Sequence, residues 1–307
     1  MSAHPADILD CIGHTTLLPL RHVVPANGAR ILLKLEGENP TGSMKDRMAL
    51  AMIAAAEADG RLKRDGFVVE YTGGSTGVSL ALVCAVKGYP LRIVTSDAFA
   101  AEKLEHMRRL GARLDIVPSE GGRMTAELTR AMVEAARVIA EAPGSYWTDQ
   151  LKNTDQLAAY HALADEIWVQ TAGRVDAFVQ SVGTAASVRG TGEGLRRHDP
   201  RVRIVAVEPA ESAVLSGGPS GAHRIDGIGA GFVVPLWHAG VADEIERVST
   251  EEATAMTHRL AREEGLLAGT STGCNVIAAL RVAERLGPGA TIVTVMCDTG
   301  MKYLSRH

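Results

Sequence analysis

The chain has 307 residues, a hydrophobic fraction of 46% and an aromatic fraction of only 4%, so aliphatic side chains must fill its core. This length supports one large domain or two of ordinary size. The formal net charge of −4 and the lack of a cluster of Lys and Arg with aromatic residues argue against binding to nucleic acid. No apolar run approaches the ~20 residues that a membrane-spanning helix needs, so we expect no membrane association.

Short runs rich in β-branched residues alternate with Ala-rich runs of helical period. The predicted strands are Arg30–Leu35, Phe67–Tyr71, Leu91–Thr95, Arg113–Val117, Ala177–Ser181, Arg203–Val207 and Thr291–Met296. The predicted helices are Asp46–Asp59, Val78–Lys87, Ala100–Leu110, Ala126–Glu141, Thr154–Thr171, Ser187–Arg197, Thr250–Glu264 and Asn275–Leu286. This order predicts an α/β fold whose mostly parallel sheets are flanked by helices.

The four cysteines are scattered singly and form no C-x-x-C pair. They are Cys11, Cys84, Cys274 and Cys297. Such spacing favours free thiols over metal ligands or disulfides, so we expect a reduced, cytoplasmic protein that holds no metal.

Lys45 lies where a turn-forming segment opens onto a predicted helix, in the run N-P-T-G-S-M-K-D-R from Asn39 to Arg47. The N–H groups of a helix start are electropositive, and burial disfavours a charged amine, so both effects favour the neutral amine. A neutral lysine amine attacks carbonyl carbons and forms Schiff bases. The alternative is a solvated surface charge.

Three Gly-rich turns lie next to predicted helices. Thr72–Gly77 follows the strand Phe67–Tyr71, Gly183–Ser187 follows the strand Ala177–Ser181, and Gly269–Gly273 precedes the helix that begins near Asn275. Small residues, hydroxyls and backbone N–H groups at a helix start bind anions. Two such turns in one chain suggest a ligand with two anionic ends, such as pyridoxal phosphate joined to an amino acid. The alternative is that they are ordinary connections.

A serine hydrolase is a competing interpretation, because Ser75 and Ser271 each lie in a G-x-S-x-G pattern. The acid and histidine that a hydrolase needs would be Asp298 and His307. A histidine at the end of the chain is poorly placed for catalysis, and this interpretation leaves Lys45 unexplained. We therefore set it aside.

Taken together, the motifs resemble those of the cysteine synthase and cystathionine β-synthase family, which are fold-type II pyridoxal-phosphate enzymes. The segment Asn39–Arg47 is similar to the family's lysine motif. Ile12–Leu17 is similar to I-G-N-T-P-L, Gly227–Phe232 to G-I-G-A-G-F, and Lys302–Ser305 to (R/K)-Y-L-S. The resemblance therefore covers nearly the whole chain.

This resemblance implies a two-lobed fold like that of the tryptophan synthase β chain. Residues 44–147 would form a smaller lobe that closes on the substrate. Residues 1–43 and 148–307 would form a larger lobe that binds the phosphate and ring of pyridoxal 5'-phosphate. The family is usually homodimeric, so the resemblance also implies a homodimer.

The resemblance also implies roles for individual residues. Lys45 would bind the cofactor covalently and move the Cα proton of the substrate, an amino acid. The other implied cofactor-binding residues are Ser75, Gly183, Thr184, Ala185, Ala186, Ser187 and Ser271. The implied substrate-binding residues are Thr72, Gly73, Ser75, Thr76, Gln150 and Gly227.

Ser271 would face the pyridine nitrogen, and a hydroxyl cannot supply the charge that an acidic partner gives the ring. This favours loss of a β-leaving group and then β-replacement on an activated L-serine, most simply O-acetylserine and sulfide giving L-cysteine and acetate. Two alternatives remain within the enzyme class: β-elimination, and β-replacement with another nucleophile or activated serine. A third is a catalytically idle relative that binds a metabolite or a partner.

The sequence departs from the family pattern in two loops. Where the family has T-S-G-N-T-G, this chain has glycine at position 73 in place of serine and serine at position 75 in place of asparagine. These two changes leave the identity of the activated serine open. Where the family has G-T-G-G-T, this chain has alanines at positions 185 and 186 in place of the two glycines. Because each alanine adds a methyl group to a crowded turn, we expect cofactor binding to survive there but to be weaker.

Overall fold

The computed structural model describes residues 4–26, 28–122 and 125–304. The chain divides into two compact units. The first comprises Met1–Ile12 and Lys45–Gln156, and the second comprises Gly13–Met44 and Leu157–His307. Ser305 and His307, which belong to sequence motifs considered above, lie outside the described residues.

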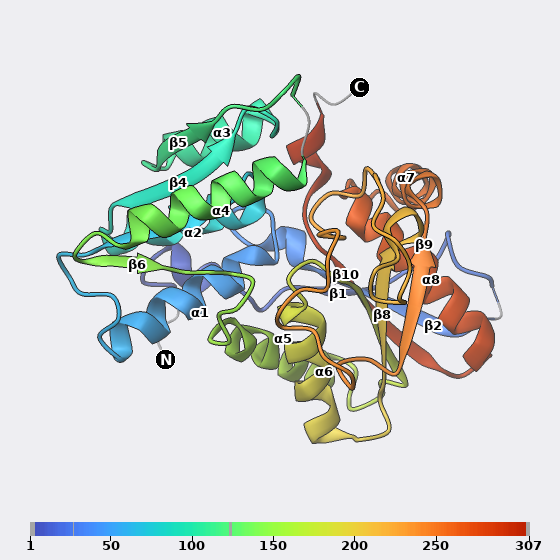
Figure 1. Ribbon diagram of the computed structural model, residues 1–307. Coiled ribbons are helices and arrows are strands. Elements are labelled where there is room, and N and C mark those ends of the chain that lie inside the picture. Colours follow the sequence, from blue (N-terminus) through green and yellow to red (C-terminus); the bar gives the residue numbers. More distant parts are fainter. Residues whose placement is uncertain (1–3, 27, 123–124, 305–307) are drawn as a thin grey trace. The chain divides into compact units, whose positions relative to one another are not determined.

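A four-stranded parallel sheet forms the centre of the first unit, with the order β5-β4-β3-β6. Its strands are β3 (Phe67–Tyr71), β4 (Leu91–Ser96), β5 (Arg113–Val117) and β6 (Ser145–Trp147). The surrounding helices are α1 (Lys45–Ala58), α2 (Ser75–Lys87), α3 (Ala101–Arg109), α4 (Ala126–Ala140) and the short η1 (Ile8–Cys11). Figure 1 shows α4 on one face of this sheet and α2 on the other.

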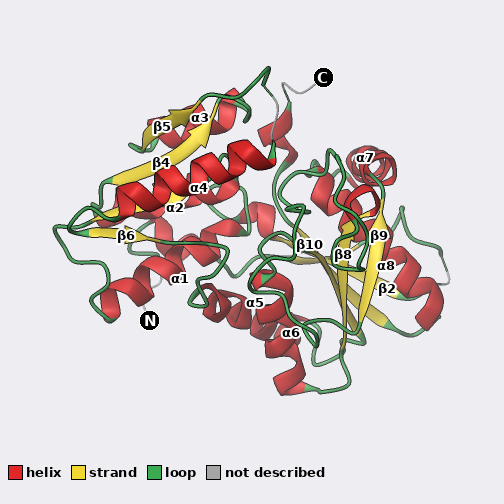
Figure 2. Cartoon of the chain, in the orientation of Figure 1, coloured by secondary structure: helices red, strands yellow, loops and turns green. Residues whose placement is uncertain are grey.

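The second unit is built on a six-stranded sheet with the order β1-β2-β10-β7-β8-β9. Its strands are β1 (Leu17–Pro19), β2 (Arg30–Leu35), β7 (Ala177–Ser181), β8 (Arg203–Pro209), β9 (Glu244–Val248) and β10 (Thr291–Met296). Only the edge strand β1 is antiparallel to its neighbour within the described sheet. Figure 2 shows this sheet among its helices.

The helices of the second unit are α5 (Gln156–Gln170), whose first residue belongs to the first unit, α6 (Ala186–His198), α7 (Thr250–Arg259) and α8 (Thr270–Leu286). A π-helical segment, Leu260–Glu264, continues α7, and short 3₁₀ segments lie at Glu36–Glu38, Ala210–Ser212 and Gly300–Tyr303. The apolar core beneath α7 and α8 includes Ile31, Val205 and Ile292 of the sheet. The mostly parallel sheet with flanking helices agrees with the prediction from the alternating order of strands and helices.

The seven predicted strands are confirmed, but β1, β6 and β9 were not predicted. Two of them have three residues, and β9 has five residues that are mostly half-buried. Such short strands carry little periodic signal.

Two predicted helix starts are wrong by several residues, because α2 begins at Ser75 and α8 at Thr270. The first N–H groups of a helix need no intrahelical acceptor, so the polar residues of each Gly-rich turn form the first turn of the helix.

None of the described helices combines the length and the hydropathy needed to cross a bilayer.

A buried lysine links the sheet of the second unit to α5. The Lys34 side chain is 0% exposed. Its Nζ donates to Thr15 O at 2.6 Å, Glu166 Oε2 at 2.7 Å and Gln170 Oε1 at 2.9 Å. Removing one partner of such a buried pair leaves the other charge without compensation.

Replacing Lys34 by alanine is therefore expected to lower the free energy of unfolding by about 3–5 kcal/mol. Lys34→Met keeps the volume of the side chain and should cost less. Urea denaturation of the two variants measures both values. A loss below about 1 kcal/mol for Lys34→Ala contradicts a structural role for the ion pair.

Candidate active site

Lys45 is the first residue of α1, and its side chain is half-buried. The preceding residue belongs to the second unit, where the Met44 N–H donates to Cys297 O at 3.0 Å. The following residue, Asp46, is fully buried and accepts a hydrogen bond from Ser79 Oγ of α2 at 2.5 Å. The residues on both sides of Lys45 are therefore held in place. Lys45 itself lies at the start of a helix, as predicted.

The Gly-rich turn Thr72–Gly77 connects β3 to α2. It is called the carboxylate loop below, because the family resemblance implies that its residues bind the substrate carboxylate. Thr72 Oγ1 accepts from the Gly74 N–H at 3.1 Å, and Thr76 Oγ1 donates to Gln150 Oε1 at 2.8 Å. Thr76 and Gln150, predicted to act together, are thus in direct contact. The Ser75 and Thr76 N–H groups belong to the first turn of α2, where N–H groups lack intrahelical acceptors and attract anions.

A buried carboxylate, not identified from the sequence, holds Gln150 in place. Glu70 is 0% exposed and lies in β3, two residues before Thr72. Its carboxylate accepts from the Gln150 N–H at 3.0 Å, Thr148 Oγ1 at 2.7 Å and the Tyr71 N–H at 2.8 Å. Glu70 therefore joins the end of β3 to the segment that follows β6. A charged residue in an otherwise apolar strand was the sequence signal that could have identified it.

Burial raises the pKa of Glu70 to about 7, and the hydrogen bonds from Thr148, Gln150 and Tyr71 offset only part of that rise. An unfolded glutamate ionises near pH 4.5. Because the folded pKa is the higher one, the protonated form of Glu70 stabilises the fold at low pH. That contribution is lost as the pH rises from about 4.5 to about 7.

Glu70→Gln is consequently expected to change how stability depends on pH. Between pH 5 and pH 8 the wild-type protein should lose on the order of 3 kcal/mol of unfolding free energy relative to the variant. Denaturant unfolding at a series of pH values measures this difference. An equal pH dependence for the two proteins contradicts the raised pKa.

The predicted phosphate loop follows β7 and leads into α6. A Cβ atom added to Gly183 would lie 2.5 Å from Gly227 O, so the two backbones meet where a side chain cannot fit. Gly183 and Gly227, both predicted site residues, are therefore adjacent. Ala186 begins α6, and its N–H donates to Thr184 Oγ1 at 3.4 Å. This narrow loop at a helix start suits a phosphate group.

Ala185 has a left-handed backbone, with φ of 70°. That conformation costs a residue with a Cβ about 1–2 kcal/mol and costs glycine little. The strain gives a physical reason for the glycine that the family pattern has at this position.

We expect Ala185→Gly to raise the free energy of unfolding by about 0.5–1 kcal/mol, after the greater freedom of glycine in the unfolded chain is subtracted. The neighbouring Ala186 is helical, so Ala186→Gly should lower it by a similar amount. Parallel denaturation of the two variants measures both changes. A loss of stability in each would contradict the strain at Ala185.

Ser271 lies in the first turn of α8 and is 4% exposed. Its neighbour Thr270 accepts at Oγ1 from the Asp226 N–H at 3.1 Å, next to Gly227. Asn275, another residue not identified from the sequence, accepts from the Ser181 N–H at 2.7 Å and donates to Val295 O at 2.8 Å. Asn275 thus ties the start of α8 to the carboxyl ends of β7 and β10, the edge at which α/β proteins bind ligands.

The predicted residues fall into two groups. Lys45, Thr72, Gly73, Ser75, Thr76 and Gln150 belong to the first unit. Gly183, Thr184, Ala185, Ala186, Ser187, Gly227 and Ser271 belong to the second. The described residues contain no cluster of side chains that could hold a metal ion.

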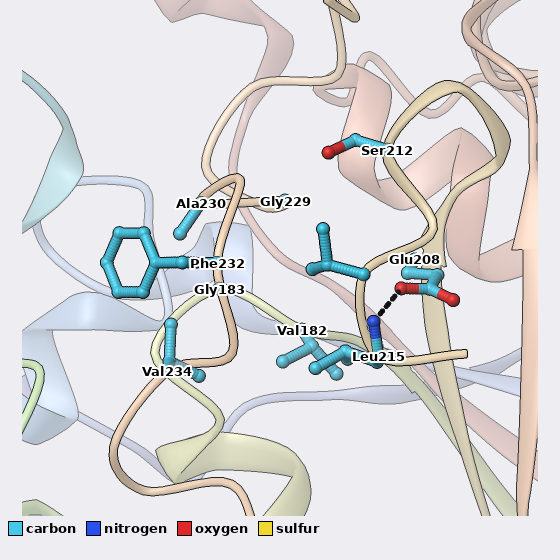
Figure 3. A pocket seen from close by; sticks show the side chains of 10 residues that line it. Val182, Gly183, Glu208, Ser212, Leu215, Gly229, Ala230, Phe232 and Val234 are labelled. Carbon is cyan, nitrogen blue, oxygen red and sulfur yellow. Dashed lines mark hydrogen bonds between the residues drawn. The ribbon is translucent and has the colours of Figure 1, made fainter. Parts of the chain in front are cut away.

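A small cavity lies beside Gly183 of the predicted phosphate loop, in the second unit (Figure 3). Its walls include Gly183, Ser212, Phe232 and Glu208, whose carboxylate accepts from the Leu215 N–H at 2.7 Å. The cavity has a volume of about 10 Å³, enough for roughly one water molecule. It cannot hold a cofactor or an amino acid.

Comparisons of the chain with family models, with curated sequences and with solved structures agree. The family model of pyridoxal-phosphate dependent enzymes matches residues 8–298. The cysteine synthase of Staphylococcus aureus is 38% identical over 99% of this chain and 97% of its own length. O-acetylserine sulfhydrylase isoform 3 of Entamoeba histolytica is 40% identical, with a TM-score of 0.91 over 98% of this chain and 90% of its own.

A second solved structure of the same fold is the O-acetylserine-dependent cystathionine β-synthase of Helicobacter pylori. It is 34% identical, with a TM-score of 0.92, and the match covers 100% of this chain and 99% of its own. The resemblance inferred from the sequence motifs and the predicted fold class are thereby confirmed.

Proposed function

Because the chain belongs to the family of pyridoxal-phosphate dependent enzymes, we propose that it catalyses β-replacement on an activated L-serine. The simplest reaction is that of O-acetylserine with sulfide to give L-cysteine and acetate. The carrying observation is that Lys45 begins a helix in the same unit as the loop Thr72–Thr76, which offers helix-start N–H groups to a carboxylate. Relatives that carry the name cysteine synthase support the choice of reaction.

The residues of the second unit fit the cofactor. The narrow loop Gly183–Ser187 and the start of α6 would hold its phosphate, and the Ser271 hydroxyl would meet the ring nitrogen. Bound pyridoxal phosphate supplies an electron sink for bonds broken at the substrate's α and β carbons. Ser271 is a neutral partner, which favours prompt departure of the β-substituent.

The residues of the first unit would act on the substrate. The backbone N–H groups of the loop Thr72–Thr76 would bind its carboxylate, with Gln150 held against Thr76. Lys45 Nζ would take the proton from the substrate Cα atom, as a general base. These residue roles form part of the proposal, as do a homodimeric assembly and a cytoplasmic location.

A second candidate is β-replacement in which the β-substituent of the activated serine leaves as before, and the thiol of another amino acid adds in place of sulfide. The Helicobacter pylori match favours it, because that protein is a cystathionine β-synthase that depends on O-acetylserine. The glycine and serine at positions 73 and 75 also distinguish this loop from the usual family pattern. β-Elimination without a second nucleophile is the remaining enzymatic outcome.

Purified holoenzyme incubated with a panel of activated serines and nucleophiles tests the proposal, with products identified by mass. L-cysteine from O-acetylserine and sulfide is the expected product, and cystathionine from homocysteine would favour the second candidate. Pyruvate and ammonia alone would indicate β-elimination. If no pair of activated serine and nucleophile gives a product, an enzymatic function is contradicted.

Lys45→Ala should lower kcat by a factor of at least about 10³, because the variant lacks the group that moves the Cα proton. It should also lose the covalently bound cofactor, which is detected by absorbance and by mass after borohydride reduction. Lys63→Ala is the matched control, because Lys63 is an exposed lysine of the same unit. Full turnover by Lys45→Ala would overturn the assignment.

A further inference from the structure

The carboxylate loop packs against an aromatic ring at one point. A Cβ atom added to Gly73 would lie 1.9 Å from two atoms of the Phe99 ring and 2.4 Å from a third. The ring therefore occupies the volume that any side chain on residue 73 would need. Both residues belong to the first unit.

The Phe99 ring is half-buried and packs against the core of the first unit. Phe99 lies in the turn after β4, where its N–H donates to Ser96 O at 3.2 Å. Its side chain packs against the apolar core that Val69, Val94 and Met132 form under α4. To admit a larger residue at position 73 the ring would have to give up these contacts, which has a cost.

Two hydroxyls of this loop take part in hydrogen bonds that shape it. Thr72 Oγ1 accepts from the Gly74 N–H, and Thr76 Oγ1 donates its proton to Gln150. A serine at position 73 would add another hydroxyl to the loop, and the Phe99 ring excludes it. An anion on this loop therefore binds without a hydroxyl from residue 73. It draws on the backbone N–H groups and the remaining hydroxyls, whose positions depend on how the loop is supported.

We propose that Phe99 is a positioning residue that sets the affinity of this site for the carboxylate of its amino-acid substrate. The ring supports the loop at Gly73 and prevents position 73 from carrying a hydroxyl donor. Gly73 and Phe99 act as a pair, so either residue changed alone impairs the loop, whereas changing both restores it. This inference rests on the proposed function, because it assigns the loop to a substrate carboxylate.

A double-mutant cycle in the holoenzyme tests the pair, with kcat and KM for O-acetylserine as the measurements. Phe99→Ala removes the support and should raise KM about tenfold with little change in kcat, because carboxylate binding contributes equally to ground and transition states. Gly73→Ser should also raise KM, because its side chain meets the ring. The double variant has room for the serine and should return KM to the wild-type value or below it.

Three controls separate this role from general destabilisation. Phe67→Ala removes another aromatic ring packed on the same core and should lower the melting temperature while leaving KM unchanged. Phe99→Leu keeps part of the support and should give an intermediate KM. O-acetylserinamide lacks the carboxylate, so the two positions should show no coupling with this compound as substrate.

The inference is overturned if Phe99→Ala leaves KM for O-acetylserine unchanged. It is also overturned if the effects of the two single changes on KM simply multiply in the double variant, whatever the melting temperatures show. Failure of the proposed function has a different signature: wild-type holoenzyme neither converts nor binds any activated serine. Binding is measured at equilibrium from the absorbance of the cofactor.

Discussion

The N–H groups in the first turns of α2, α6 and α8 are what the candidate binding loops of the two units depend on. α2 and α6 each begin within a few residues of the end of a parallel strand, and α8 begins beside the carboxyl ends of β7 and β10. The first N–H groups of a helix have no partner within it, and they carry partial positive charge. Within each unit, the parallel strands end at the same edge of the sheet, so such groups gather there. The anionic ends of an amino acid and of a phosphate cofactor are what these helix starts are suited to bind.

Buried polar side chains form hydrogen bonds that hold these helix starts and loops in place beside the strands. In the first unit Glu70 bonds to the segment that contains Gln150, and Asp46 bonds to Ser79 of α2. In the second unit Asn275 bonds to the ends of two strands. Each of these groups is buried and costly to leave unpaired, so the positions of the loops follow from hydrogen bonds made inside the units.

The loops themselves are shaped by sites where a side chain does not fit or fits under strain. Gly183 must lack a Cβ atom because Gly227 O approaches it, and Gly73 must lack one because Phe99 does. Ala185 keeps its Cβ atom in a left-handed conformation. The departures from the family motifs thus have different physical consequences: the one at Gly73 is matched by a neighbouring ring, and the one at Ala185 is borne as backbone strain.

The sequence determined the alternation of strand and helix, and it determined the motifs that identify the family, because periodicity and turn chemistry act over a few residues. It placed Lys45 at a helix start and Thr76 with Gln150 through motif resemblance. Only the tertiary structure decided that Glu70 holds Gln150 and that Phe99 fills the space beside Gly73. These contacts join segments that are far apart in the chain, and the spacing of residues along the chain carries no record of which side chains meet.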